Sequence, residues 1–467
     1  MWEPPGIHSA AVSTAALIAS VRAARGEDAP ARLETLHVIT HTGAFDAVAH
    51  VRGTAYRIDV VIGNAKYSFG RIDGKSWRRT PSGSVRIIRS DVQGDMLDRW
   101  PRALFGFDPA GCIANGGAEV DNMTTDVLDC RIDGDYEHWY FIDPRSGRIL
   151  REMSREGSRV VWYDFADFRT IDGFTQPYSW RIGGADGHAD VTVTDESEAN
   201  VAATEVAVPS TVPATFRLPV SGVARIPAFF NYHIEVPVQI DGRTLHFTID
   251  TGTSQTIVDI GVATRLGLNP QFGHAVIPEL RAGAAIAENL PVEAIDDFHN
   301  SEDDGILGNE FFTGHVVHID YVHQKVEMIA HDAFNPPAGA FALPIDVSEG
   351  IPIAAAAVDD VPGDRFVLDT GSYFILLRSD FANHLTHLTR SKALPPQGGF
   401  LEGPFELQPA SLQNFLLGKY RFASADAMVE VPNRENTDFP LDGILGAEVL
   451  SLFDLWFDYD NGTVWMR

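Results

Sequence analysis

Two similar stretches of sequence decide the fold: residues 247–253 read FTIDTGT, and residues 366–372 read FVLDTGS. Each stretch is followed by the pentapeptide DGILG, at residues 304–308 and at residues 442–446. An Asp-Tyr pair and a Val-x-Met then follow each pentapeptide at the same spacing. Self-similarity of this kind indicates an internal repeat, and we assign its two copies to residues 209–335 and residues 336–467.

The chemistry of the repeat lies in its two aspartates. A hydrophobic strand precedes each one, so we expect Asp250 and Asp369 to meet in a dry interface. Two carboxylates about 3 Å apart cannot both ionise, and such a pair shares one proton. The ionised member acts as general base on a water molecule, and the protonated member polarises a carbonyl group. The titration belongs to the pair, so neither aspartate has a fixed role. The neighbours expected to support them by hydrogen bonds and close backbone approach are Thr251, Gly252, Thr253, Thr370, Gly371 and Ser372.

On these motifs, residues 209–467 resemble the retropepsin-like aspartic proteases, in the bacterial form in which two halves are fused in one chain. The resemblance implies a bilobal, pseudo-twofold double β-barrel of the pepsin type and an aspartic endopeptidase with catalytic Asp250 and Asp369. It also implies a peptide or protein substrate and no cofactor or metal. Fusion gives the two halves a high effective concentration, so we expect a monomer with an intrachain dyad. Pairing of each half with a half of another molecule is the alternative.

The two copies differ in length, because the stretch from Asp369 to Gly443 is 19 residues longer than the stretch from Asp250 to Gly305. The extra length contains residues 395–404, PPQGGFLEGP. Glycine-hinged lids close over substrates, so we predict a substrate-binding flap here that includes Gly398, Gly399 and Phe400. An ordinary surface loop is the alternative. The first copy offers only residues 269–276, and we therefore expect a single flap.

Residues 1–208 have a different pattern. An amphipathic helix that ends near Gly26 is followed by short alternating segments separated by turn residues, and a second helix is expected over residues 92–104. The expected strands are residues 33–39, 45–51, 56–62, 84–88, 136–142, 148–153, 160–165, 178–182 and 189–193. This predicts one large, curved antiparallel sheet with a few helices, and hence a mainly β chain. The segments FIDPRSGRIL (141–150) and YDFADFRTIDG (163–173) resemble those of LolA/LolB-type lipoprotein carriers. That resemblance implies lipid or lipoprotein binding on a half-barrel, and a domain without a ligand is the alternative.

Charge and cysteine content limit the partners and the cellular compartment that we expect. A net charge of -28 disfavours partners such as nucleic acid and anionic membrane surfaces. No apolar run reaches the roughly 18 residues of a transmembrane segment. Cys112 and Cys130 form either a disulfide or two buried thiols; a disulfide suits an exported protein. Residues 10–19 lack the basic flank of a signal peptide, so we expect the mature form, without its export signal, of a periplasmic or secreted bacterial protein.

Two further sequence features carry weaker signals. Residues three apart on a strand face opposite sides, so His315, His318 and His323 are not expected to hold a metal jointly. Asp320 and Asp458 each precede a tyrosine and are expected in a turn or an exposed strand contact, without a catalytic role.

The alternative function is a catalytically weak or inactive protein that uses the protease fold as a docking groove for peptides or lipoproteins. The intact aspartates argue against it, whereas the reduced first flap and the carrier-like N-terminal domain argue for it.

Overall fold

The chain is described by a computed structural model. The described residues are 12–26, 36–42, 46–53, 55–62, 65–79, 85–88, 111–131, 136–156, 159–171, 173–184, 187–197, 201–209, 215–231, 233–270, 273–296, 303–348, 350–394, 397–399, 403–431 and 441–467. The chain divides into two compact units, one made of most of Met1–Pro209 and the other containing Ser210–Arg467. Within the described ranges, no helix is long and apolar enough to cross a membrane.

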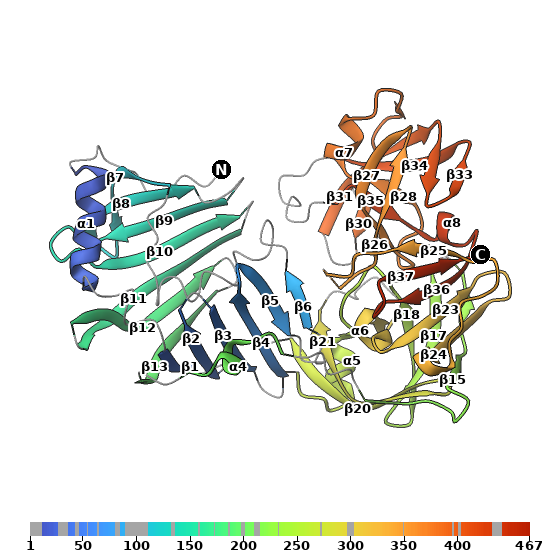
Figure 1. The fold of residues 1–467 in the computed structure, drawn as a ribbon, viewed down its shortest axis with the longest axis horizontal. Coiled ribbons are helices and arrows are strands. Elements are labelled where there is room, and N and C mark those ends of the chain that lie inside the picture. The colour runs from blue at the N-terminus through green and yellow to red at the C-terminus, as the bar shows by residue number, and fades with distance from the viewer. Residues whose placement is uncertain are drawn as a thin grey trace. The chain divides into compact units, whose positions relative to one another are not determined.

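The described strands before residue 198 form one antiparallel sheet of thirteen strands, in the order β6-β5-β4-β3-β2-β1-β13-β12-β11-β10-β9-β8-β7 (Figure 1). Most neighbours in this order are also neighbours in sequence, as expected for a meander. The strands are β1 (Leu36–Thr42), β2 (Asp46–Arg52), β3 (Ala55–Ile62), β4 (Ala65–Ile72), β5 (Lys75–Arg79), β6 (Val85–Ile88), β7 (Cys112–Val120), β8 (Met123–Arg131), β9 (Tyr136–Ile142), β10 (Ile149–Glu156), β11 (Arg159–Ile171), β12 (Phe174–Gly184) and β13 (Gly187–Ser197).

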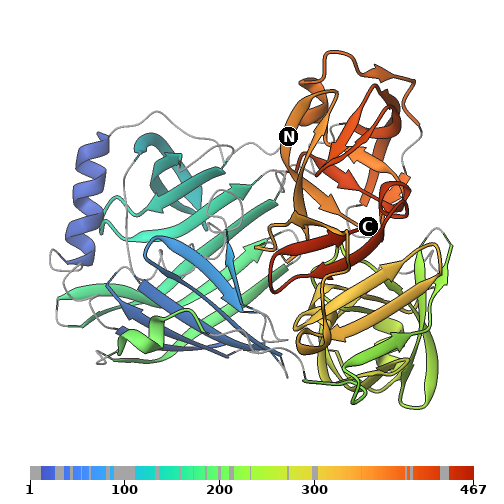
Figure 2. The ribbon, with the colours of Figure 1, turned by 45° about the vertical axis from the view of Figure 1, so that its right-hand side comes forward.

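Helix α1 (Thr14–Arg25) shows how strongly this sheet curves. The side chain of Ser13 caps its first turn, and Gly26 ends it with a left-handed φ of 102°. The helix contacts β7, β8 and β12. In a flat sheet β7 and β12 would lie about 24 Å apart, whereas a 12-residue helix is only about 18 Å long. The sheet therefore curls around the helix, and Figure 2 shows the same curvature.

A hairpin of β7 and β8 carries the two cysteines. Asp121 and Asn122 form its turn with φ values of 47° and 63°, which match a two-residue turn of the type that favours Asp and Asn. A β-bulge between Ala114 and Gly117 shifts the register by one residue, and this shift puts Cys112 directly opposite Cys130. The two residues are joined by a disulfide.

The first copy of the repeat folds around one curled sheet, in the order β14-β21-β19-β22-β18-β17-β16 with β20 paired to β17 and β21. Its elements are β14 (Thr215–Arg217), β16 (Phe229–Phe230), β17 (Ile234–Ile240), β18 (Arg243–Ile249), β19 (Ile257–Asp259), α5 (Ile260–Arg265), β20 (His274–Ala282), β21 (Ala285–Ile295), β22 (Gly305–Leu307) and α6 (Asn309–Phe312). Helix α4 (Ala203–Val206) precedes this half, and η1 (His331–Ala333) follows its last strand.

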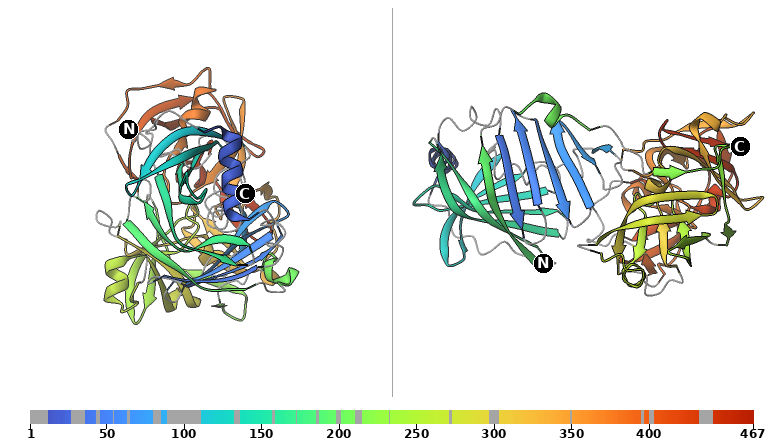
Figure 3. Two further views of the ribbon diagram at one scale, coloured as in Figure 1. Left: turned by 90° about the vertical axis from the view of Figure 1, so that its left-hand side faces the viewer. Right: turned by 90° about the horizontal axis from the view of Figure 1, so that it is seen from below.

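The second copy repeats this arrangement in the order β29-β31-β34-β28-β35-β27-β26-β32-β33, with β30 paired to β31. Its elements are β26 (Ile353–Val358), β27 (Val361–Leu368), β28 (Ile375–Leu377), α7 (Ser379–Asn383), β29 (Thr389–Arg390), β30 (Gln397–Gly399), β31 (Gly403–Leu412), β32 (Phe415–Leu417), β33 (Tyr420–Phe422), β34 (Ala425–Val431), β35 (Gly443–Leu445) and α8 (Ala447–Leu450). Figure 3 shows the strands of both copies from two further directions.

A six-stranded sheet joins the two copies, in the order β15-β24-β23-β36-β37-β25. The first half supplies β15 (Val223–Ile226), β23 (His315–Asp320) and β24 (Lys325–Ala330); the second half supplies β25 (Phe341–Pro344), β36 (Asp454–Asp458) and β37 (Thr463–Met466). At its centre, His318 of β23 pairs with Trp456 of β36. These two residues hold equivalent places in the repeat, two positions before Asp320 and Asp458. Antiparallel pairing of equivalent residues defines a local pseudo-twofold axis between the halves.

The prediction of a mainly β chain, with a curved half-barrel sheet followed by a double β-barrel, is confirmed. The N-terminal helix is present as α1. The sequence reading missed four strands, β4, β5, β7 and β8. The helix expected over residues 92–104 lies outside the described residues.

Candidate active site

Each aspartate follows the end of a central strand. Strand β18 leads to Asp250 and pairs in parallel with β22; β27 leads to Asp369 and pairs in parallel with β35. The ladder continues one step beyond each strand, because the Asp250 N–H donates to the Leu307 carbonyl at 3.1 Å and the Asp369 N–H donates to the Leu445 carbonyl at 3.0 Å. The Ile-Leu pair of DGILG thus fixes the backbone position of each aspartate.

The polar and small residues of DGILG explain why this pentapeptide recurs. Asp304 accepts a hydrogen bond from the His246 N–H at 3.0 Å, and Asp442 accepts one from the Arg365 N–H at 3.0 Å. A Cβ on Gly305 would lie 2.5 Å from the Ile257 carbonyl oxygen. On Gly443 it would lie 2.4 Å from the Leu376 carbonyl oxygen. The carboxylate ties two strands together, and the glycine lets a third chain segment cross closely.

Thr251 and Thr370 connect the two halves through four hydrogen bonds. The Thr251 hydroxyl donates to the Leu368 carbonyl at 2.7 Å, and the Thr370 hydroxyl donates to the Ile249 carbonyl at 2.9 Å. Each hydroxyl also accepts the backbone N–H of the other threonine, at 3.1 and 3.0 Å. Both threonines are fully buried. This symmetric set of bonds holds the two aspartate loops in register.

Asp250 and Asp369 lie side by side. A hydrogen bond joins their side chains. The two glycines allow this approach: a Cβ on Gly252 would lie 2.5 Å from Asp369 Cγ, and a Cβ on Gly371 would lie 2.4 Å from Asp250 Cγ. Any side chain at either glycine would therefore push the opposite carboxyl group away.

Backbone and hydroxyl donors orient both carboxyl groups. Asp250 accepts the Gly252 N–H at 2.8 Å and the Thr253 hydroxyl at 2.9 Å. Asp369 accepts the Gly371 N–H at 2.7 Å and the Ser372 N–H at 3.2 Å. The two sets are equivalent at the glycines and differ at the next residue, where the first half uses a hydroxyl and the second a backbone N–H. This is one point where the pseudo-symmetry of the pair is broken.

The electrostatics favour a shared proton. Burial raises the pKa of Asp369 well above its usual value, and the neighbouring Asp250 charge and the hydrogen bond between the two raise it further. The N–H groups of Gly371 and Ser372 lower it in part. A buried carboxyl beside a second carboxyl keeps its proton at a pH where an isolated aspartate has lost it. The pair can therefore hold one acidic and one basic group together.

Two tyrosines that the sequence reading set aside belong to this neighbourhood. Tyr321 and Tyr459 occupy equivalent places, one residue beyond β23 and β36. Burial, and then the Asp369 charge, raises the pKa of Tyr321; burial, and then the Asp250 charge, raises the pKa of Tyr459. Each tyrosine thus senses the aspartate of the opposite half. The recurrence of Asp-Tyr in both copies was the available signal.

The aspartates of the same pairs are buried, which corrects the expectation of an exposed contact. Asp320 accepts the His323 N–H at 2.9 Å, and Asp458 accepts the Asn461 N–H at 3.2 Å. Both lie in the six-stranded sheet, where surrounding residues of the same chain shield them from solvent. The turn part of the expectation holds, because both carboxylates cap the turn that follows their strand. Burial depended on the pairing of the two halves, which a local pattern does not contain.

Asn309, the residue after the first DGILG, is a further contact between the halves. Its buried amide donates to the Thr251 carbonyl at 3.0 Å and to the Gly350 carbonyl of the second half at 2.7 Å. Ala447 holds the equivalent place in the second copy and has no such amide. The difference between Asn309 and Ala447 was visible in the repeat alignment, but its partner Gly350 was not.

The segment predicted as a flap forms a hairpin in its described part. Gly398 and Gly399 lie in β30 and pair with Pro404 and Gly403 of β31. Phe400 lies outside the described residues. Whether this hairpin covers the aspartate pair stays a prediction.

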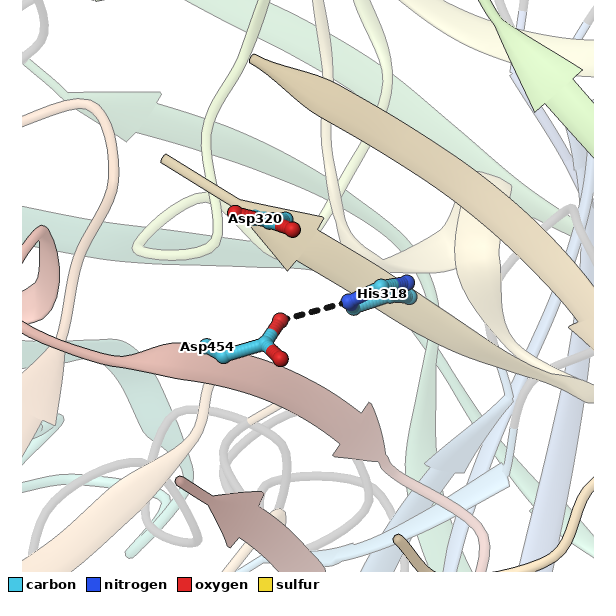
Figure 4. Close-up of side chains that lie close together, drawn as sticks. All are labelled: His318, Asp320 and Asp454. Carbon is cyan, nitrogen blue, oxygen red and sulfur yellow. Dashed lines mark hydrogen bonds and ion pairs between the residues drawn. The ribbon is translucent and has the colours of Figure 1, made fainter. Parts of the chain in front are cut away.

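A second cluster of ionisable groups lies at the centre of the six-stranded sheet. His318, Asp320 and Asp454 have ligand atoms within 4.8 Å of one another, and no other such group occurs among the described residues (Figure 4). His318 Nε2 lies 2.6 Å from Asp454 Oδ1. Arg467 also donates to Asp454, at 2.6 Å, and the His318 ring stacks on Trp456 at 4.3 Å. The cluster is explained by pairing between the two halves, and we assign it no metal.

The geometry can be compared with known proteins. Residues 236–311 match the aspartyl protease family. The matched segment runs from β17 into α6 and includes Asp250, Thr251, Gly252 and the first DGILG. No curated protein matches the chain. The first copy of the repeat therefore contains a segment that is similar to the aspartyl protease family.

Proposed function

We propose that the protein is an aspartic endopeptidase of the single-chain retropepsin-like type, in which Asp250 and Asp369 activate water for peptide-bond hydrolysis. The hydrogen-bonded carboxyl pair carries this proposal. The symmetric threonine bonds support it, because they fix both loops at the geometry that the pair needs. The family match over the first half supports a protease function in general.

The reaction follows from one proton held by two carboxyl groups. The ionised carboxylate takes a proton from water as the water oxygen attacks the peptide carbonyl carbon. The protonated carboxyl donates its proton to the carbonyl oxygen, which gives a neutral tetrahedral diol. The diol then returns a proton to the amide nitrogen while the C–N bond breaks, releasing a carboxylic acid and an amine. Either aspartate can hold the initial proton, because the titration belongs to the pair.

The test uses the full chain and a mixed peptide library, incubated from acidic to neutral pH. We expect cleavage by the wild type and none by Asp250→Asn or Asp369→Asn. Asp380→Asn is the matched control, because Asp380 is an exposed carboxylate on α7. Cleavage that survives either dyad substitution would overturn the proposal. Binding of peptides without cleavage under any condition would favour the alternative of a docking groove.

A mixing experiment separates the intrachain dyad from pairing between molecules. The Asp250→Asn chain keeps a normal second half, and the Asp369→Asn chain keeps a normal first half. If halves paired between molecules, a mixture of the two inactive variants would regain activity. We expect no recovery, because the threonine bonds and the shared six-stranded sheet join the halves of one chain.

We also propose that the protein is periplasmic or secreted. The Cys112–Cys130 disulfide supports an oxidising compartment, as in the periplasm or outside the cell.

Lipid binding by the first unit has less support. A cavity beside α1, lined by Arg25, Phe165 and Phe168 among others, has a volume of only about 20 Å³. That is of the order of one water molecule, so it offers no room for an acyl chain.

A further inference from the structure

The surroundings of the two aspartates are unequal in polarity. Tyr373 and Phe374 follow Asp369 by four and five residues, and their side chains are 40% and 41% exposed. They pack edge to face, with ring centroids 5.1 Å apart. Together the two exposed rings form an apolar surface four and five residues after Asp369.

The first half presents the same backbone with polar side chains. Ser254 and Gln255 stand where Tyr373 and Phe374 stand in the second copy. The Ser254 carbonyl accepts the Glu310 N–H at 3.0 Å, and the Tyr373 carbonyl accepts the Glu448 N–H at 2.9 Å. This backbone hydrogen bond is equivalent in the two halves, whereas the side chains differ.

These residues lie within reach of a peptide at the dyad. The chain spans at most about 3.6 Å per residue, so Tyr373 lies within roughly 14 Å of Asp369. The Ser372 N–H bond to Asp369 folds the intervening residues into a turn and shortens that distance. A bound peptide in extended form rises about 3.3 Å per residue. The aromatic surface would therefore meet side chains within about four residues of the scissile bond.

We propose that Tyr373 and Phe374 are specificity-determining residues, which select peptides with a large apolar or aromatic side chain on the Asp369 side of the scissile bond. Ser254 and Gln255 accept polar side chains on the other side. The preferred substrate is thus asymmetric, apolar on one side of the cleaved bond and polar on the other. This inference rests on the proposed peptidase function and assigns direction to the same site.

The test exchanges the two surfaces. The variant Tyr373→Ser/Phe374→Gln gives the second half the residues of the first, and Leu452→Gln is the control, because Leu452 is an exposed apolar side chain of the same half. Two peptide series are used, identical except for an aromatic or a polar residue near the cleaved bond. We expect kcat/KM for the aromatic series to fall roughly tenfold in the double variant, the low end for an apolar contact. The polar series and the Leu452→Gln control should be unchanged.

The outcomes separate this inference from the proposed function. An equal loss for both series, or no preference in the wild type, would overturn the inference while leaving the peptidase intact. If the wild type cleaves nothing, the proposed function fails, and the same peptides are then titrated against Asp250→Asn by calorimetry. If the aromatic series binds more tightly, and Tyr373→Ser/Phe374→Gln abolishes that difference, the role of the aromatic surface in peptide recognition would still be supported. Equal affinities would refute it.

Discussion

Replacing Thr370 with valine tests whether the threonine bonds hold the two halves together. The substitution keeps the shape of the side chain and removes its hydroxyl. It breaks the bond to the Ile249 carbonyl at 2.9 Å and the bond from the Thr251 N–H at 3.1 Å. Both lost partners lie in the buried interface between the halves. A buried polar group left without a partner costs about 1–3 kcal/mol, so the two lost partners predict a loss of about 2–6 kcal/mol in the free energy of unfolding.

The chain offers a matched control five residues away from the partner threonine. Thr256 is fully buried, and its hydroxyl has no hydrogen-bond partner among the described residues. Thr256→Val therefore removes the same atom from a similar environment without breaking a bond. We expect its free energy of unfolding to be unchanged or slightly higher, because an unpaired buried hydroxyl is itself unfavourable.

Denaturant unfolding, followed by fluorescence and by peptide cleavage, measures both variants. Thr251→Val should cost about as much as Thr370→Val, since it breaks the equivalent bonds. The double variant should cost less than the sum, because the two hydroxyls share partners. If Thr370→Val were no more harmful than Thr256→Val, the four bonds would not hold the halves, and the explanation of the site geometry would fail.

Four further predictions follow from the same contacts. Because the pKa of Asp369 is raised in the folded state, its contribution to stability is greatest at low pH and is lost as the pH rises from about 4, the unfolded value, through the raised pKa; unfolding free energy measured against pH should show this slope in the wild type and lose it in Asp369→Asn. Gly252→Ala places a methyl group against the Asp369 carboxyl, and displacements near 1 Å can cost about 100-fold in rate, so kcat should fall at least that far; near-normal kcat would contradict the close approach. Tyr459→Phe removes a buried hydroxyl that has no described partner, so chemical denaturation should show no loss of stability, and a loss above about 1 kcal/mol would reveal a hidden bond. Reduction of the Cys112–Cys130 disulfide, which spans 18 residues, should destabilise the first unit by about 3 kcal/mol, visible as a lower melting temperature with reductant and absent in Cys112→Ala/Cys130→Ala.

The repeat allowed most of the second unit to be predicted, because its signals are local. A hydrophobic strand, Asp-Thr-Gly and DGILG recur in order, and each motif sets the backbone of one loop. The pairing of β23 with β36 could not be predicted in this way. It joins residues more than 130 positions apart, and nothing near His318 or Trp456 names its partner. The burial of Asp320 and Asp458 depends on that sheet, which is why they were misplaced.

In the first unit, the missed strands had signals of different strength. The Asp121-Asn122 dipeptide is a hairpin signal between alternating segments, and it could have predicted β7 and β8. It would not have identified the disulfide, because regular pairing from this turn places Cys112 opposite Arg131, and only the β-bulge between Ala114 and Gly117 brings it opposite Cys130. Strands β4 and β5 are joined by Asp73 and Gly74, where φ is 51° and 75°. Asp-Gly is also a hairpin signal, and it could have predicted the strands on its two sides.

The departures from symmetry indicate what fusion of the two halves adds. The threonines and glycines that hold the aspartates are equivalent across the axis: Thr251 matches Thr370, and Gly252 matches Gly371. The next residue already differs, because Thr253 donates its hydroxyl and Ser372 its backbone N–H. Residues farther from the carboxyl groups differ, as Asn309 does from Ala447. A symmetric dimer must present the same surface on both sides of the scissile bond, although a peptide has a direction. A fused chain is free of that constraint, because each copy can change alone. In the proposed peptidase, the shared proton requires near-identical loops, whereas recognition of a directional substrate requires unlike surroundings, and the two requirements fall on separate residues.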